Sequence, residues 1–201
     1  MYHIVLAHLR AIDPTLYAVG QTVTLEEHVI RSPKHYFSSL CSEIIGQQLS
    51  GRVADVLFDR FEKLFSRKRV TPRAVLRRSE ETLRSTGMSW SKARFIRDLA
   101  QHVLTKSVKL DQLAQLTDED VIRELIKVKG IGPWTAEMFL MFTLGRQDVF
   151  SYGDLGLRNA IKKLYGFKKD PTVKQMERIA DKWRPYRTYA ARILWKSLDR
   201  T

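Results

Sequence analysis

The chain has 201 residues, of which 44% are hydrophobic and 10% aromatic, and this composition excludes a mainly disordered protein. Its 35 lysines and arginines outnumber 22 acidic residues, which gives a net charge of +13. This charge favours a polyanionic partner such as nucleic acid, and the alternative is a soluble protein whose surface is basic without such a partner. The single cysteine, Cys41, excludes an internal disulfide and a thiolate-ligated cluster. The five histidines lack metal-ligand spacing, and no apolar stretch is long enough to span a bilayer.

Helical spacing of apolar residues dominates the chain, and this predicts an all-α protein. Helices are expected over 2–11, 33 to about 46, 50–64, 79–87, 89–103, 117–128, 133–144, 172–183 and 187–198. Two further helices are expected to begin at 71 and at about 154. Asp13-Pro14 is expected to end the first of them. A short extended piece at 22–25 is the one stretch with alternating character. The length suits one compact unit or two small lobes that share an interface.

The segment 125–136 holds two glycines, Gly130 and Gly132, around the apolar Ile131 and between two helical patterns. Glycines at such positions permit a tight hairpin with positive φ angles, with Ile131 filling the space between the helices. Pro133 suits the first position of the following helix, whose free N–H groups would form a site for a phosphate. Because such contacts reach the backbone of DNA, they give affinity without reading sequence. The alternative is an ordinary helical turn with a glycine cap.

Five segments, taken in order, resemble the helix-hairpin-helix DNA glycosylases, and most closely the 3-methyladenine DNA glycosylase II type. They are 44–50 (IIGQQLS), 83–94 (LRSTGMSWSKAR), 126–137 (IKVKGIGPWTAE), 148–158 (with DVF and GDLGLR) and 183–190 (WRPYRTYA), with Trp195 beyond. The similarity runs through nearly the whole chain. It implies a glycosylase fold of two helical lobes with the active site between them. It also implies one compact unit over 1–201, with the hairpin element at about 118–144 and without the N-terminal β domain of longer members.

The resemblance places the family's catalytic aspartate on Asp154, although the family often has two adjacent aspartates and this chain has Gly153-Asp154. From the residues alone, Asp154 is a helix N-cap, and the two roles are compatible. Trp134 stands where members with strand-cutting activity carry a nucleophilic lysine, so base release by water is expected. Trp134, Met138 and Trp195 match the positions that line the family's base pocket. Core packing is the alternative for each of the three, and the better one for Met138.

The resemblance also assigns DNA contacts to the hairpin and to one glutamine. Gln48 matches the residue that fills the gap left by a flipped base, with a role at a helix end as the alternative. The carbonyls of Ile126, Val128 and Gly130 match those that hold a monovalent cation, Na⁺ or K⁺, against DNA phosphate, and no cofactor is expected to be required. The hairpin residues expected to contact DNA are Lys129, Gly130, Ile131, Gly132, Pro133, Trp134 and Thr135.

The function implied is base excision repair. A monofunctional glycosylase would hydrolyse the N-glycosidic bond of alkylated purines, 3-methyladenine and 7-methylguanine, in double-stranded DNA and leave an abasic site. A cytoplasmic, nucleoid-associated monomer without a membrane partner is expected. The alternatives are a glycosylase for deaminated or mismatched bases, a module that binds DNA without catalysis, and a purely structural helical protein. The last leaves both the charge and the hairpin unexplained.

Overall fold

The computed structural model describes residues 1–26 and 30–198, and within these ranges it contains helices and no β-strand. The α-helices are α1 (Tyr2–Ile12), α2 (Pro14–Thr22), α3 (Tyr36–Gly46), α4 (Gly51–Lys63), α5 (Pro72–Leu76), α6 (Glu80–Arg84), α7 (Trp90–Leu104), α8 (Asp118–Leu125), α9 (Pro133–Phe142), α10 (Leu155–Leu164), α11 (Val173–Ala180) and α12 (Arg187–Leu198). Short 3₁₀ segments are η1 (Pro33–His35), η2 (Ser66–Lys68), η3 (Leu110–Gln115) and η4 (Asp181–Trp183). The all-α prediction is confirmed.

The chain divides into two compact bodies. The central body spans Ile30–Leu144, and the terminal body combines the described residues up to 26 with those from Gly145 to 198.

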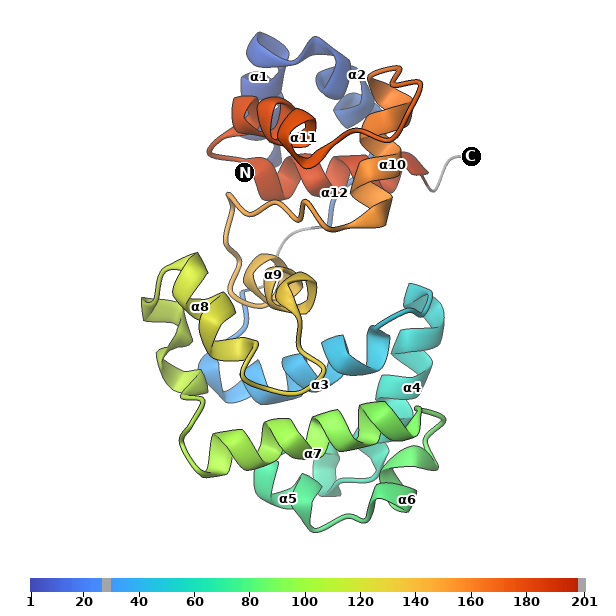
Figure 1. Ribbon diagram of the computed structural model, residues 1–201, viewed down its shortest axis with the longest axis vertical. Coiled ribbons are helices and arrows are strands. Elements are labelled where there is room, and N and C mark those ends of the chain that lie inside the picture. Colours follow the sequence, from blue (N-terminus) through green and yellow to red (C-terminus); the bar gives the residue numbers. More distant parts are fainter. Residues whose placement is uncertain (27–29, 199–201) are drawn as a thin grey trace. The chain divides into compact units, whose positions relative to one another are not determined.

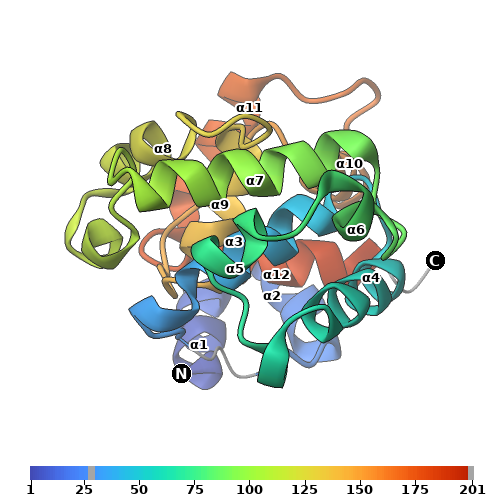
Figure 2. The same cartoon turned by 90° about the horizontal axis from the view of Figure 1, so that it is seen from below.

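The central body is built around α3 and α7, which pack against each other (Figure 1). Helix α3 also contacts α4 and α9, while α5 and α6 cover another side of α7, as the view from below makes clear (Figure 2). The apolar spacing of α3 explains its central position, because Leu40, Ile44 and Ile45 are fully buried. On α7, Ile96 and Leu99 are buried in the same way.

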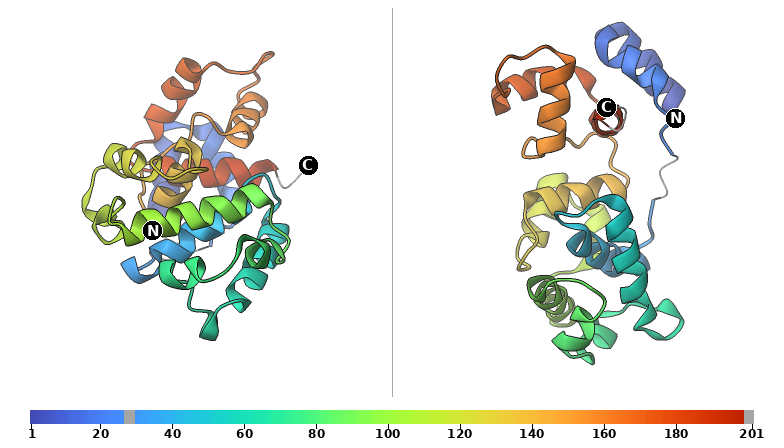
Figure 3. Two further views of the ribbon diagram at one scale, coloured as in Figure 1. Left: turned by 60° about the horizontal axis from the view of Figure 1, so that its bottom comes forward. Right: turned by 90° about the vertical axis from the view of Figure 1, so that its right-hand side faces the viewer.

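In the terminal body, α12 packs against α10 and α2, and α1 packs against α2 (Figure 3). A buried polar centre joins the two ends of the chain here. The carboxylate Oδ2 of Asp13 accepts hydrogen bonds from the Tyr165 hydroxyl at 2.6 Å and from the Trp183 indole N–H at 2.8 Å. Both donors satisfy a carboxylate that would otherwise be costly to bury.

Helix α2 was not predicted from the sequence. Asp13-Pro14 ends α1 as predicted, but it also starts the next helix at once, because Asp13 Oδ1 accepts from the Leu16 N–H at 3.0 Å and Pro14 occupies the first helical position. Of the extended piece suggested at 22–25, Thr22 belongs to α2, while Val23 directly after it has an extended backbone with φ −112° and ψ 147° and is not part of a strand. The helices around the hairpin are shorter than predicted, with α8 ending at Leu125 and α9 at Phe142.

Candidate active site and DNA-binding hairpin

The hairpin between α8 and α9 depends on Gly130. Its φ is +83°, a conformation that residues with a side chain rarely adopt, and a Cβ at this position would overlap the ring of Phe95 on α7. Gly132 differs from expectation, since its φ is −97° and nothing lies within 4 Å of the position of a Cβ. The need for positive φ predicted for both glycines therefore applies to Gly130 alone.

Ile131 is buried, and its N–H donates to the Val128 carbonyl at 3.1 Å. Pro133 occupies the first turn of α9, and Gly132 caps this helix without a side-chain hydrogen bond. The N–H groups of the first turn therefore have no side chain of the cap residue in front of them. An anionic group is the partner that such a helix end accepts best.

Gln47, at the end of α3, ties the hairpin to the segment that contains the predicted wedge. Its side-chain amide donates to the Gly130 carbonyl at 2.8 Å and to the Thr135 hydroxyl at 3.0 Å. Lys92 Nζ from α7 donates to the carbonyls of Ile45 at 2.8 Å and Gln47 at 2.7 Å. Partial burial lowers the pKa of Lys92.

Gln47 and Lys92 were both missed in the sequence. The position of Lys92 could have indicated its role. A positive charge in the first turn of a helix is repelled by the positive end of the helix dipole, so a lysine there is expected to have another partner. Gln48, the predicted wedge, is exposed and has a φ of +59°, so its backbone turns sharply away from α3.

The remaining hairpin residues differ in exposure. Lys129 is exposed, and its backbone N–H donates to Asp98 Oδ2 at 2.8 Å. Trp134 is 37% exposed, whereas Thr135 and Met138 are 3% and 4% exposed. The burial of Met138 favours the packing alternative for that residue.

Two of the three carbonyls expected to bind a cation already accept a hydrogen bond. Gly130 O accepts from Gln47, and Val128 O accepts from the Ile131 N–H. A carbonyl oxygen has two lone pairs, so each retains one acceptor position, and a weakly bound monovalent ion is compatible with this set. Among the described residues, no group of three His, Cys, Asp or Glu side chains could hold a metal ion.

Asp154 is the N-cap of α10 in the terminal body. Its Oδ1 accepts from the Leu157 N–H at 2.7 Å and from the Trp195 indole N–H at 3.0 Å. The residue is only 9% exposed, and a Cβ on Gly156 would lie 3.1 Å from the same oxygen. The N-cap interpretation is thus confirmed, and Trp195 of α12 is brought to this carboxylate. Two hydrogen bonds and close packing hold one carboxylate oxygen in a fixed position.

The segment that leads to Asp154 is anchored by the residues of the WRPYRTYA motif. Asp148 Oδ1 accepts from Arg187 Nε at 2.7 Å, and Asp148 Oδ2 accepts from Arg184 Nη1 at 2.9 Å. The Thr188 hydroxyl donates to the Arg146 carbonyl at 2.7 Å and accepts from the Val149 N–H at 3.0 Å. The motif was recognised in the sequence, but its partner Asp148 was not. The anchor fixes the path of the chain just before the catalytic candidate.

This arrangement of helices and hairpin is that of the HhH-GPD superfamily of base excision DNA repair proteins, whose sequence pattern matches residues 41–185. The chain belongs to this family. The predicted superfamily and all-helical fold are confirmed.

Individual relatives are consistent with this family assignment. DNA-3-methyladenine glycosylase 1 of Schizosaccharomyces pombe is 31% identical over 166 residues, which cover 82% of this chain and 73% of that protein. A solved structure of the S. pombe 3-methyladenine DNA glycosylase in complex with abasic DNA superposes with a TM-score of 0.88 at 27% identity, covering 97% of this chain and 96% of that one.

The Bacillus subtilis protein YfjP, named as a candidate DNA-3-methyladenine glycosylase, is 34% identical over 162 residues. That alignment covers 78% of this chain and 56% of YfjP, so the chain spans little more than half of this relative. None of the described helices combines the length and apolarity that a membrane span requires.

Proposed function

We propose that the chain is a monofunctional DNA glycosylase that releases alkylated purines, 3-methyladenine and 7-methylguanine, from double-stranded DNA and leaves an abasic site. The observation that carries the proposal is the Asp154 carboxylate, nearly buried and oriented by the Leu157 and Trp195 N–H groups. The names of the relatives support the substrate class.

In the proposed reaction, Asp154 stabilises positive charge on the sugar. The bond between C1′ and the base nitrogen breaks, its electron pair leaves with the base, and the sugar becomes an oxocarbenium ion. A carboxylate held in a fixed position stabilises that charge without reorganisation. Water then adds to C1′ and loses a proton, for which Asp154 is the proposed acceptor. A positively charged alkylated purine needs little further assistance to leave.

The base must leave the helical stack before this chemistry, and we propose that Gln48 fills the gap. Trp134 and Trp195 are proposed to stack on the electron-poor base, a contact worth about 0.5–2 kcal/mol. Met138 would support the pocket from within the core. Trp134 cannot form a Schiff base, which supports hydrolysis without strand cleavage.

The hairpin is proposed to hold the DNA backbone through the N-terminus of α9. Lys129 adds charge, and the carbonyls of Ile126, Val128 and Gly130 would place a Na⁺ or K⁺ ion against a phosphate. The hairpin residues proposed to contact DNA are Lys129, Gly130, Ile131, Gly132, Pro133, Trp134 and Thr135. No other cofactor is proposed, and the enzyme is proposed to act as a monomer in the cytoplasm, associated with the nucleoid.

The test is base release from duplex DNA carrying 3-methyladenine or 7-methylguanine, assayed with and without alkaline strand cleavage. Wild type should release free base, with strand breaks after alkali only. Asp154→Asn should lose release while still binding DNA, since asparagine also caps helices well. Release retained in Asp154→Asn would exclude the assignment of Asp154. Tight DNA binding without release by wild type would favour a binding module.

A further inference from the structure

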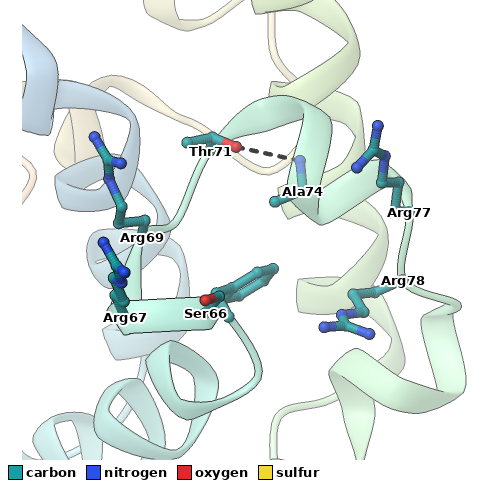
Figure 4. A pocket seen from close by; sticks show the side chains of 8 residues that line it. Ser66, Arg67, Arg69, Thr71, Ala74, Arg77 and Arg78 are labelled. Carbon is teal, nitrogen blue, oxygen red and sulfur yellow. Dashed lines mark hydrogen bonds between the residues drawn. The ribbon is translucent and has the colours of Figure 1, made fainter.

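An open pocket rimmed by arginines lies on the central body, between η2 and α5. The pocket has a volume of about 570 Å³ and is lined by Arg67, Arg69, Arg77 and Arg78, with Phe65 among its buried lining residues. Figure 4 shows Arg67 and Arg69 on one side and Arg77 and Arg78 on the other. We call it the arginine pocket.

The positive charge in this region is concentrated in a segment that contains no acidic residue. Residues 66–79 contain six basic side chains and no acidic one, which is nearly half of the net charge of +13 in a short stretch. Lys68 is neutralised by Asp59 at 2.8 Å. Within the described ranges, the side chains of Arg67, Arg69 and Arg77 make no ion pair or hydrogen bond. Like charges around one hollow repel each other, and an anion between them relieves that repulsion.

Part of the pocket is held in place by hydrogen bonds. The guanidinium of Arg78 donates to the Leu64 carbonyl at 2.8 Å, and Arg97 of α7 donates to the Arg78 carbonyl. Opposite these, Arg67 has a φ of +52°, and Lys68 has a φ of +54°. Two consecutive left-handed residues with side chains are strained. A surface whose only role is contact with water would need neither the hydrogen-bonded Arg78 nor the strained turn at Arg67 and Lys68.

The pocket lies away from the hairpin. Helix α4 has 13 residues, so it is about 20 Å long, and it separates the Gln47–Ser50 segment at its start from η2 at its end. Gln47 in turn contacts the hairpin through Gly130. Helix α7 also lies between them, because Asp98 contacts Lys129 while the neighbouring Arg97 reaches α5 and the residues after it. A phosphate bound at the hairpin is therefore not the one that enters the arginine pocket.

We propose that the arginine pocket binds backbone phosphates of DNA outside the stretch held by the hairpin. Guanidinium groups pair with phosphate oxygens through two parallel hydrogen bonds, which a lysine cannot form. The pocket has room for more than one phosphate. Such a contact adds affinity without sequence reading and lengthens the DNA footprint. The inference uses the family's DNA-binding role but not the proposed chemistry at Asp154.

The test compares undamaged duplexes of about 11 and about 31 base pairs. The shorter duplex extends only about 5 base pairs, or about 17 Å, on each side of the hairpin contact, so it is too short to reach the arginine pocket as well. The pocket variant carries Arg67→Gln, Arg69→Gln and Arg77→Gln, and it leaves the structural Arg78 in place. The control removes three exposed charges elsewhere, with Lys174→Gln, Arg178→Gln and Lys182→Gln. Binding is measured as a function of salt, and thermal unfolding confirms that each variant is folded.

On the long duplex, the plot of log K against log salt should be less steep for the pocket variant than for wild type by about 2–3, because each phosphate contact contributes about 0.9 to the slope. The control should match wild type, and all three proteins should bind the short duplex alike. An unchanged slope on the long duplex overturns the proposal, as does an equal loss in the control or on the short duplex. Pocket-dependent binding of polyglutamate with an unchanged DNA slope would also overturn it, in favour of an acidic protein partner.

Base release from a short lesion duplex separates this inference from the proposed function. The pocket variant should release base at the wild-type rate in a single turnover. If no protein releases base, the proposed function fails, while the salt slopes still decide whether the pocket binds DNA.

Discussion

The side-chain amide of Gln47 donates to the carbonyl of Gly130, 83 residues further along the chain, across 2.8 Å. The same amide reaches the Thr135 hydroxyl, and the Gln47 carbonyl accepts from Lys92. Three segments that the sequence separates, the end of α3, the start of α7 and the hairpin, are thus fixed to one another inside the central body. Because the exposed Gln48 follows directly, this network determines where the predicted wedge stands relative to the hairpin.

Replacing Gln47 with alanine should destabilise the protein by about 1–3 kcal/mol, since the half-buried acceptors of the hairpin lose their donor. DNA affinity should fall as well, because the hairpin is no longer held against α3. Urea unfolding and DNA binding measure the two effects. The matched control is Gln48→Ala, which should leave the free energy of unfolding within about 0.5 kcal/mol because this side chain is exposed. Equal stability of Gln47→Ala and wild type would contradict the role given to the network.

The two hairpin glycines should respond in opposite ways to alanine. Gly130→Ala combines a positive φ with overlap of the Phe95 ring, so a loss of at least about 2 kcal/mol is expected. Gly132→Ala meets open space at a φ of −97°, and its melting temperature should stay close to that of wild type. Thermal unfolding of both variants gives the comparison. A fully stable Gly130→Ala would show that the hairpin can adopt another path.

Local patterns in the sequence were enough to predict most helices and the hairpin, because apolar spacing and caps depend on neighbouring residues. Asp13-Pro14 misled, since the same dipeptide can end one helix and begin another. The partners of Gln47, Lys92 and Asp148 could not be read from the chain. Their hydrogen bonds join residues 36 to 88 positions apart, and only packing brings these together.

Within the candidate site, the resemblance pointed to Asp154, and the N-cap was evident from the aspartate before a helical pattern. The donation from Trp195 was not evident, because nothing in local spacing relates α12 to the start of α10. The sequence pattern also left open which hairpin side chains are exposed. Met138 and Thr135 are buried, while Trp134 and Lys129 reach the surface.

Asp154 serves both stability and proposed chemistry, and two variants should separate the roles. Asp154→Ala removes the cap, so unfolding should become easier by about 1 kcal/mol, whereas Asp154→Asn keeps an acceptor and should change stability by a few tenths. Both should slow base release by about 10²–10⁴-fold, because neither carries a carboxylate. Chemical unfolding and single-turnover release are measured side by side. A slow Asp154→Ala combined with a fast Asp154→Asn would mean that the residue acts through the cap alone.

Glu43 on α3 predicts a pH dependence of stability. It lines a pocket of about 370 Å³ together with Arg31, His35 and Glu62, and burial raises its pKa from 4.5 to about 7. The folded state therefore binds a proton that the unfolded chain releases at pH 4.5, so this contribution is greatest below pH 4.5 and is lost as pH rises to about 7. The loss is on the order of 2–3 kcal/mol. Glu43→Gln should match wild type at pH 4 and be more stable at pH 8, as measured by urea unfolding at both pH values, while Glu62→Gln, on the same pocket, serves as the control. Parallel stability of wild type and Glu43→Gln at both pH values would show that Glu43 ionises normally.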